Sequence, residues 1–477
     1  MSDPEDADHI PKVAGVSEAE WVELLDRAEE VGLLTQTAKA GDSIFYRLHP
    51  ALPWYFRQRF LTAYGDPDAN DARALHAVRS YVEAVGALGE HLHNAYADGR
   101  QDMLVGMRLE EENLLHVRWL ARKHGWWRPV IGAMQGVMGL YALAGRHAEW
   151  RRLVEETTPH FFDGETDGPA AGLEEEWSLV AEYRVRILRE DRHWESAERL
   201  QRLVVEWDRA RARPFLDQEP ATLSDPHQHR LAGYATSLAG LARIQYERGS
   251  AECIAGFKDA YSIHMKLGSR NAAATAANTL GVAYLNIESI RDLDEAARWY
   301  AIDLDLTPTE DRHARGQTHA QLGLVALALH DDAKTAGASE ASLLEHLNAA
   351  LAAYREALAM FPEEAAGHRA AAHNGLGLVH QGAGRAARAL HHFQESLRYQ
   401  EAQGDLLGAG TVRSNVAQLL TRHGRFSEAL LYARAALSNY ESFGERAADE
   451  ISRARGLIAA IERMQAEHGD NARPRPA

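Results

Sequence analysis

The feature that most constrains this chain is a spacing of small, apolar and aromatic residues that returns along its C-terminal half. In the segment NGLGLVHQGAGRAARALHHFQESL, Leu376 and Gly377 stand together, and Ala389 and Phe393 follow. Two antiparallel helices that cross closely cannot both carry bulk at the contact, and an aromatic ring fills the space that the small residues leave. The spacing therefore predicts a pair of closely packed antiparallel helices.

Further segments repeat this spacing. They contain Leu280-Gly281 with Ala296 and Tyr300, Leu322-Gly323 with Ala350 and Tyr354, and Val416-Ala417 with Ala429 and Ala433, and LAGLARIQYERGSAECIAGFKDAY fits with a slip of one residue. In the second of these, the segment DDAKTAGASE after His330 is predicted to be a long loop. Helix pairs in tandem bury their apolar faces by stacking on their neighbours, so the chain is predicted to be an all-α solenoid.

The N-terminal segment has a different residue pattern from the repeated segments. Ser17 followed by Glu20 predicts a capping box at the start of a helix, and LLTQTA and IFYRLHP, joined by the turn-prone KAGDS, predict a β-hairpin before a second helix. Helix, hairpin and helix make up most of a winged-helix module. Its acidic residues outnumber its basic ones, so we expect it to pack or dock rather than to bind DNA.

These patterns predict five regions. They are a disordered leader over 1–16, a partial winged-helix-like module over 17–66, a degenerate repeat-like helical region over 67–212, a solenoid of about five repeats and a capping helix over 213–467, and a disordered tail over 468–477.

The repeats resemble tetratricopeptide repeats. A partial winged helix ending in YRLHPALPWYFR, then EEENLLHVRWLARKHGWW, then repeats about forty residues long, resemble the C-terminal half of bacterial STAND proteins, the signal-transducing ATPases with numerous domains. The resemblance implies a right-handed superhelix whose repeats sense a ligand or partner and restrain an ATPase module.

The nucleotide-binding motif of that family is missing. No G-x-x-x-x-G-K-[ST] occurs in the chain, so we expect no ATP hydrolysis by it. Three alternatives remain open: an excised part of a larger protein, a product that acts with a separate NTPase or effector, or a degenerate relative that kept the sensor.

Composition narrows the function classes further. The net charge of −17 makes nucleic acid an unlikely partner. No apolar stretch is long enough for a membrane span, and the acidic start lacks a secretion signal, so a cytoplasmic location is expected. The single cysteine, Cys253, is predicted to be a buried apolar residue. With no metal or nucleophile motif present, and His391-His392 adjacent, we expect no metal site, no cofactor and no catalytic residue.

The function is therefore expected to lie in a concave groove lined by the first helix of each pair. Amide side chains recur there, one or two positions before the Leu-Gly or Val-Ala pair, as Asn278, Gln321, Asn374 and Asn415. An amide can hold the backbone of an extended peptide, as similar Asn ladders do in peptide-binding tetratricopeptide proteins. The alternative is that these amides cap or bridge adjacent helices. Thr275, Gln317, Gln381, Gln418 and Arg422 are predicted to share the groove.

The leading hypothesis is a non-enzymatic protein that binds a peptide or protein partner, as the sensor half of a STAND-type signalling or defence system. The alternative is a transcriptional regulator in which the winged helix contacts DNA and the repeats sense an inducer. Outside the groove, adjacent Trp126 and Trp127 are predicted to place one ring in the core and to leave the other exposed as an interface anchor.

Overall fold

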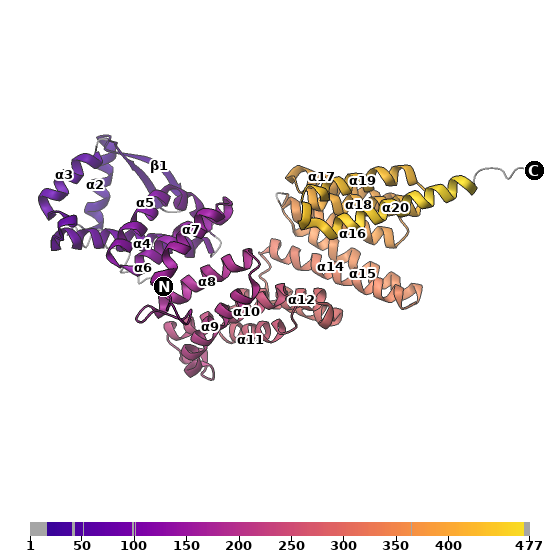
Figure 1. The fold of residues 1–477 in the computed structure, drawn as a ribbon, viewed down its shortest axis with the longest axis horizontal. Coiled ribbons are helices and arrows are strands. Elements are labelled where there is room, and N and C mark those ends of the chain that lie inside the picture. Colours follow the sequence, from indigo (N-terminus) through magenta and orange to yellow (C-terminus); the bar gives the residue numbers. More distant parts are fainter. Residues whose placement is uncertain are drawn as a thin grey trace, which may run out of the picture. The chain divides into compact units, whose positions relative to one another are not determined.

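The computed structural model describes residues 17–40, 43–50, 52–97, 100, 102–363 and 365–471. The predicted leader and residues 472–477 of the predicted tail lie outside this part of the chain. The described residues form nineteen α-helices and one two-stranded sheet, which confirms the predicted all-α class with a small hairpin. The chain divides into two compact units, residues 1–204 and 205–477, with the boundary inside α9 (Figure 1).

The first unit begins with the predicted helix, hairpin and helix. These are α2 (Glu18–Glu30), β1 (Leu34–Ala40), β2 (Ser43–Leu48) and α3 (Leu52–Tyr64). The capping box is confirmed, since the Ser17 N–H donates to Glu20 Oε2 at 2.8 Å and the Ser17 hydroxyl accepts from the Glu20 N–H. The two strands are antiparallel, with a bulge between Gln36 and Ala38. Phe45 of β2 is buried and joins the main core of this unit.

The rest of the first unit is a bundle of helices. It contains α4 (Ala72–Ala97), α5 (Met103–His124), α6 (Trp127–Leu143), α7 (His147–Thr157), α8 (Glu174–Glu190) and the start of α9 (Trp194–Ala212), with short helices at Pro67–Ala69 and Thr158–His160. α4 and α6 approach closely through Gly89 and Gly136, because a methyl group at Gly136 would lie only 2.8 Å from the Gly89 Cα.

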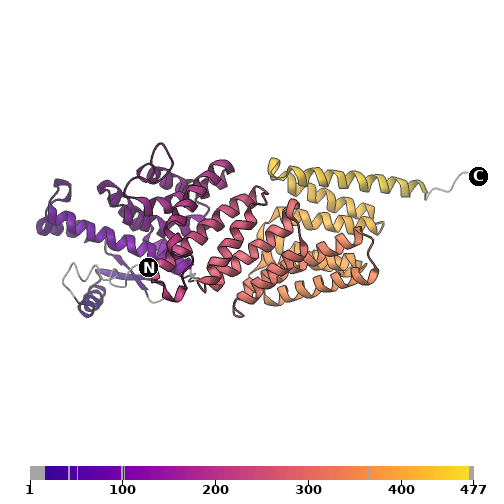
Figure 2. The same cartoon turned by 90° about the horizontal axis from the view of Figure 1, so that it is seen from below.

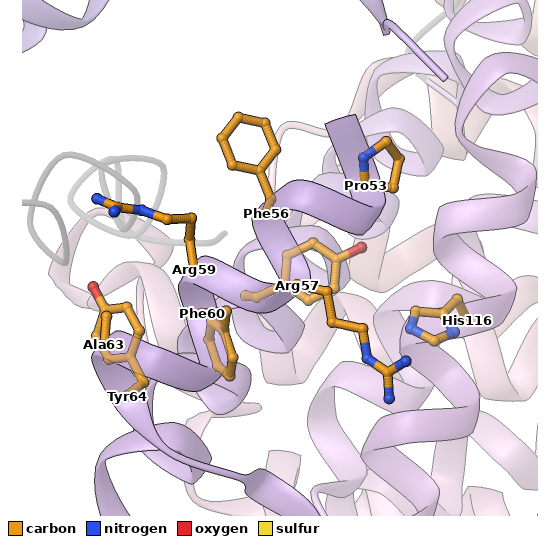
Figure 3. A pocket seen from close by; sticks show the side chains of 9 residues that line it. Pro53, Phe56, Arg57, Arg59, Phe60, Ala63, Tyr64 and His116 are labelled. Carbon is orange, nitrogen blue, oxygen red and sulfur yellow. The ribbon is translucent and has the colours of Figure 1, made fainter. Parts of the chain in front are cut away.

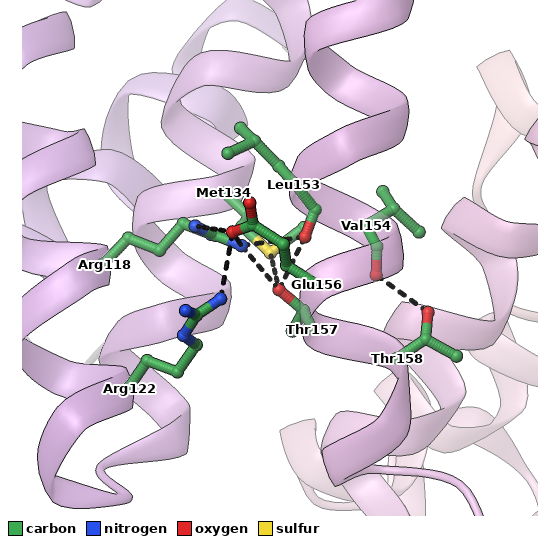
Figure 4. Close-up of polar contacts among 8 residues, drawn as sticks. All are labelled: Arg118, Arg122, Met134, Leu153, Val154, Glu156, Thr157 and Thr158. Atoms are coloured by element: carbon green, nitrogen blue, oxygen red, sulfur yellow. Dashed lines mark hydrogen bonds and ion pairs between the residues drawn. The ribbon is translucent and has the colours of Figure 1, made fainter.

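A buried arginine ties α5 to α7 in this bundle (Figure 4). Arg118 is 6% exposed, and it donates to the Leu153 carbonyl at 2.9 Å and to the Thr157 hydroxyl at 3.0 Å. Glu156 accepts from both Arg118 and Arg122. Burial lowers the pKa of Arg118, and the Glu156 carboxylate opposes that shift. The guanidinium thus satisfies polar groups that would otherwise be buried without a charged donor.

Replacing Arg118 by Met should lower the free energy of unfolding by about 1–3 kcal/mol, because the buried Thr157 hydroxyl and the Glu156 carboxylate lose a charged donor. The measurement is denaturant-induced unfolding followed by circular dichroism. Arg122→Met is the matched control, since that side chain is more exposed and its loss should cost less than about 1 kcal/mol. Equal losses in both variants would contradict a special role for the buried guanidinium.

The second unit is a stack of helix pairs, as the repeated spacing predicts (Figures 1 and 2). The pairs are α10 (Asp225–Glu247) with α11 (Cys253–Lys266), α12 (Arg270–Asn286) with α13 (Leu293–Leu306), α14 (Arg312–Thr335) with α15 (Glu340–Met360), α16 (Ala366–Gly382) with α17 (Ala386–Gln403), and α18 (Leu406–Arg422) with α19 (Phe426–Glu441). α20 (Ala448–Asn471) packs on α19 and follows the last pair. Short helices occur at Arg213–Phe215, Pro220–Thr222, Glu288–Ile290 and Gly444–Ala447.

The predicted contact between a glycine and an aromatic ring is present in three of the five pairs, α12 with α13, α14 with α15, and α16 with α17. A methyl group at Gly281 would lie 2.7 Å from the Tyr300 ring, and one at Gly323 would lie 2.8 Å from the Tyr354 ring. Gly377 faces Phe393 in the same way. All three rings are at most 4% exposed. Cys253 is also fully buried, as predicted, and burial raises the pKa of its thiol to about 11.

Three expectations from the sequence need correction or adjustment. The predicted loop DDAKTAGASE is wrong in its first half, because α14 continues to Thr335 and the break comes at Gly337, which has a φ of 72°. The last helix likewise continues to Asn471, beyond the predicted boundary at 467, because the first proline after that boundary is Pro474. Trp126 and Trp127 are both half-buried, and Trp126 stacks on His124 while Trp127 contacts His160 and Phe161, so neither is a free anchor.

Candidate binding face of the helix pairs

The residues predicted to line a groove all lie on the first helices of successive pairs. α12 carries Thr275 and Asn278, α14 carries Gln317 and Gln321, α16 carries Asn374 and Gln381, and α18 carries Asn415, Gln418 and Arg422. These first helices also contact one another, α14 with α16 and α16 with α18. Close packing along one side curves a stack toward that side, so we call the surface formed by α12, α14, α16 and α18 the inner face.

Asn278 is held by a buried carboxylate. Its amide donates to Asp303 Oδ2 at 2.8 Å, and Asp303 of α13 is only 4% exposed. The same carboxylate accepts from Thr318 at 2.5 Å and from Thr307 at 3.1 Å. Three donors therefore compensate for the burial of Asp303, and they connect α12, α13 and α14. For Asn278 the structure thus shows a bridging contact, and the amide keeps an acceptor oxygen and a second N–H.

Asn374 and Asn415 face each other across neighbouring pairs. The Asn415 amide donates to Asn374 Oδ1 at 2.9 Å, from α18 to α16, and both side chains are half-buried. The bond fixes the orientation of both amides, because each otherwise rotates freely at the surface. The bond uses one N–H of Asn415 and one lone pair of Asn374, whereas each amide has two N–H donors and two acceptor lone pairs. The pair is thus a bridge between helices that still has donors and acceptors to spare.

Gln317 reaches from α14 to α16. Its Nε2 lies 2.7 Å from His368 Nε2 and 3.2 Å from His313 Nε2, and the two imidazole rings meet edge to face at 4.7 Å. Burial, and then the charge of His313, lower the pKa of His368. A neutral His368 presents a lone pair to the Gln317 amide, which is the protonation state that this contact requires.

The other predicted residues make fewer contacts. The Thr275 hydroxyl donates to the Asn271 carbonyl within its own helix at 3.0 Å. Gln321 is half-buried, and Gln418 and Arg422 are exposed. Gln381 Oε1 is buried and has no hydrogen-bond partner among the described residues.

A cluster of four histidines lies between α16 and α17, and sequence reasoning missed it. His373 Nδ1 and His392 Nδ1 are 3.1 Å apart, so one of the two rings donates to the other. The His380 ring stacks on the His392 ring at a centroid distance of 5.3 Å, and the His391 ring lies 5.3 Å from the His392 ring. Burial, reinforced by the charges of its neighbours, lowers the pKa of His392 to about 4, and burial lowers the pKa of His373 and His380 as well. These three imidazoles are therefore neutral near pH 7.

Two arginines form a second feature that sequence reasoning missed. Arg315 donates to the carbonyls of Leu304 and Thr307, at 2.6 and 3.0 Å, at the C-terminal end of α13. Arg369 donates at the same offsets to the carbonyls of Leu358 and Phe361, at the end of α15. The sequence does contain a signal for this feature, because Arg315 and Arg369 each stand seven positions before the leucine of a Leu-Gly pair. Carbonyls at a helix end have no partner within the helix, and these guanidinium groups supply one.

A stack of helix pairs with small residues facing aromatic rings defines an α-solenoid. Within it, residues 368–442, which cover most of α16 and all of α17 to α19, match the family model described as tetratricopeptide repeat. This stretch therefore consists of tetratricopeptide repeats, and the resemblance that the sequence indicates is confirmed for it.

Several solved structures are similar in fold. Aspartyl phosphate phosphatase F from Bacillus subtilis is 13% identical over 68% of this chain and 76% of its own, with a TM-score of 0.43. A Rap protein complexed with Competence and Sporulation Factor is 10% identical over 80% of this chain and 99% of its own, with a TM-score of 0.42. A STAND protein with a tetratricopeptide repeat sensor from Pyrococcus horikoshii is 13% identical over 98% of this chain and 65% of its own, with a TM-score of 0.41. These likenesses concern the fold alone.

No curated protein matches the chain in sequence. Among the described residues, no group of three or more His, Cys, Asp or Glu side chains is arranged to hold a metal ion. In the same part of the chain, no helix combines the length and the apolar composition that a bilayer span needs.

Proposed function

We propose that this chain is a non-enzymatic interaction protein that binds a peptide or protein segment along the inner face of its helix pairs. The observation that carries the proposal is the bonded pair Asn374 and Asn415, with its unused amide groups on two adjacent inner helices. Amides held in place at neighbouring repeats can pair with successive backbone groups of an extended chain, and holding them in place beforehand reduces the entropy lost on binding. Tetratricopeptide repeats at this place in the chain support the same function.

The finer part of the proposal is that the chain is the sensor half of a STAND-type signalling or defence system. In that case the partner belongs to a complex with a separate NTPase or effector. The support is the order of the segments, helix, hairpin and helix followed by helix pairs, together with the resemblance stated above.

Replacing Asn374 and Asn415 together by Ala should weaken partner binding by about tenfold or more, because each lost hydrogen bond contributes about 0.5–1.5 kcal/mol. The measurement is a pull-down from the native cytoplasm with quantitative mass spectrometry, and thermal melting checks that the variant is folded. Asn278 stays unchanged, because its removal would take a donor from the buried Asp303.

The matched control replaces Asn348 and Gln394 by Ala. Both are exposed amides on second helices, α15 and α17, and their loss should leave binding unchanged. If an equally stable inner-face variant captures the same proteins in the same amounts as the unmodified chain, the amide pair is only a bridge between helices. An NTPase among the proteins lost by the variant would support the sensor-half hypothesis.

A further inference from the structure

The segment from α2 to α3 exposes an unusual amount of apolar surface. Of the 23 large apolar side chains that are widely exposed in the described residues, ten fall between Val22 and Tyr64. Trp54 is the most exposed of them, at 74%. None of the described side chains in α2 or α3 is buried. Exposed apolar side chains gathered on one short segment in this number indicate an interaction site.

The apolar surface of α3 forms one wall of a groove with a volume of about 890 Å³ (Figure 3). Phe56, Phe60 and Tyr64 line it from α3, at helical spacing, and Tyr81 of α4 and His116 of α5 line it from the other side. In Figure 3 the Arg57 side chain extends from α3 toward the side of the groove that holds His116.

The charged side chains that line this groove are basic, although burial, and then the charge of Glu110, raise the pKa of Tyr81. Arg57 and Arg59 line it, and α3 contains no acidic residue. The Oδ1 atom of Asp68 forms an ion pair with Lys123 Nζ at 2.7 Å, and this contact, with a smaller contribution from the charge of Arg57, lowers the pKa of Asp68. The groove therefore suits an occupant that carries both apolar and acidic side chains.

α2 has the complementary surface. Its exposed side chains include Val22 and Leu24, at 51% and 50% exposure, beside the acidic Glu23, Asp26 and Glu30. Val22, Asp26 and Glu30 are spaced four residues apart, so they share one face of the helix. An uncovered acidic and apolar helix and an uncovered basic and apolar groove thus belong to the same short module.

We propose that the α3 groove is covered by α2 of a second copy of this chain, and that the two copies exchange this contact in a two-fold symmetric dimer. A symmetric dimer makes the contact twice and covers both apolar surfaces at once. A foreign acidic peptide in the groove would leave α2 uncovered. The net charge of −17 repels the copies in general, so the local pairing of Arg57 and Arg59 with the α2 carboxylates sets the orientation.

The test is sedimentation velocity of the full chain with two charge-reversed variants, Arg57→Glu with Arg59→Glu, and Glu23→Arg with Asp26→Arg. The unmodified chain should be a dimer that salt weakens. Each variant alone should have a dimer dissociation constant raised at least tenfold, because the substituted side chains then meet charges of their own sign, carboxylates against the α2 carboxylates in the first variant and arginines against Arg57 and Arg59 in the second. An equimolar mixture of the two variants should restore the dimer, because both contacts between unlike copies pair opposite charges.

The matched control is Arg385→Glu with Arg388→Glu, which changes the net charge as much as the α3 variant does, at two exposed arginines of the second unit. It should dimerise like the unmodified chain at equal salt. Circular dichroism and thermal melting check that every variant is folded. All the α2 and α3 substitutions replace exposed side chains. An unmodified chain that is monomeric at about 50 µM, where protomers of a specific dimer associate, would overturn the proposal. So would folded variants that do not reassociate when mixed, and so would a monomer that binds duplex DNA through Arg57 and Arg59.

Discussion

Replacing Tyr354 by Ala should lower the free energy of unfolding by about 3–5 kcal/mol, since it removes a packed aromatic ring from the core. The Tyr354 ring is 4% exposed, and it packs against Gly323 of its own pair and against Gly375 of the next pair. Neither glycine has a side chain that can move into the vacated space. The cavity would therefore open at the junction of two repeats.

The measurement is equilibrium unfolding in denaturant, followed by circular dichroism. Stability in a repeat stack includes the contact of each repeat with its neighbours, so the transition of the variant should also broaden or split. Tyr354→Phe keeps the ring and should cost less than about 1.5 kcal/mol. Leu431→Ala is a control for an exposed apolar residue, at 68% exposure, and should change stability by less than about 0.5 kcal/mol. A similarly small effect of Tyr354→Ala would contradict the packing argument.

The protein should be less stable at about pH 5 than at about pH 7.5 because of the histidine cluster on α16 and α17. An unfolded histidine takes up a proton near its ordinary pKa of about 6.5, whereas folded His392 does so only near its lowered pKa of about 4. Between these two values the unfolded chain binds more protons, so stability falls as the pH falls. Above pH 6.5 the contribution to stability is fully present. Below the folded pKa it is lost.

His392→Gln should reduce this loss by about 1 kcal/mol, because the amide keeps a polar contact with His373 and does not titrate, while solvent screening limits the effect. Thermal melting at both pH values gives the comparison. His423→Gln, at an exposed histidine after α18, should leave the pH dependence unchanged. If the two variants lose stability in parallel as the pH falls, the cluster is not the source of the dependence.

Sequence predicted the helix pairs well because the pattern that defines them is local. Leu-Gly followed by an aromatic residue specifies one close contact, and the contacts of Gly281 with Tyr300 and Gly377 with Phe393 are present. The capping box at Ser17 is local in the same sense. The predicted loop after His330 is wrong in its first half, because Asp331 to Thr335 continue α14 and the backbone leaves the helical conformation only at Gly337.

The histidine cluster could not be predicted from adjacency within one helix. His391 and His392 do diverge along α17, but the rings that meet His392 come from His373 and His380 on another helix. Contacts between residues so far apart depend on the crossing of α16 and α17, which the spacing does not specify. For the inner face, the sequence placed Asn374 and Asn415 on neighbouring helices, and the bond between them came from the structure. Their part in binding a partner stays a prediction.

The arginines at the ends of α13 and α15 also give the stack a direction. The carbonyls that end α13 are satisfied by Arg315 of the following helix, and those that end α15 are satisfied by Arg369. Each of these helix ends is thus completed in part by the next pair, while Arg270 and Arg312 of the same pairs bind the carbonyls of Asp305 and Ala359. During synthesis on the ribosome, the carbonyls of Leu304 and Thr307 gain their partner Arg315 once the start of α14 has emerged. The helix pairs can therefore pack in the order in which they are made. A chain cut after α13 or α15 would lose more than a neighbour, because it would also leave without a partner the carbonyls that Arg315 or Arg369 binds.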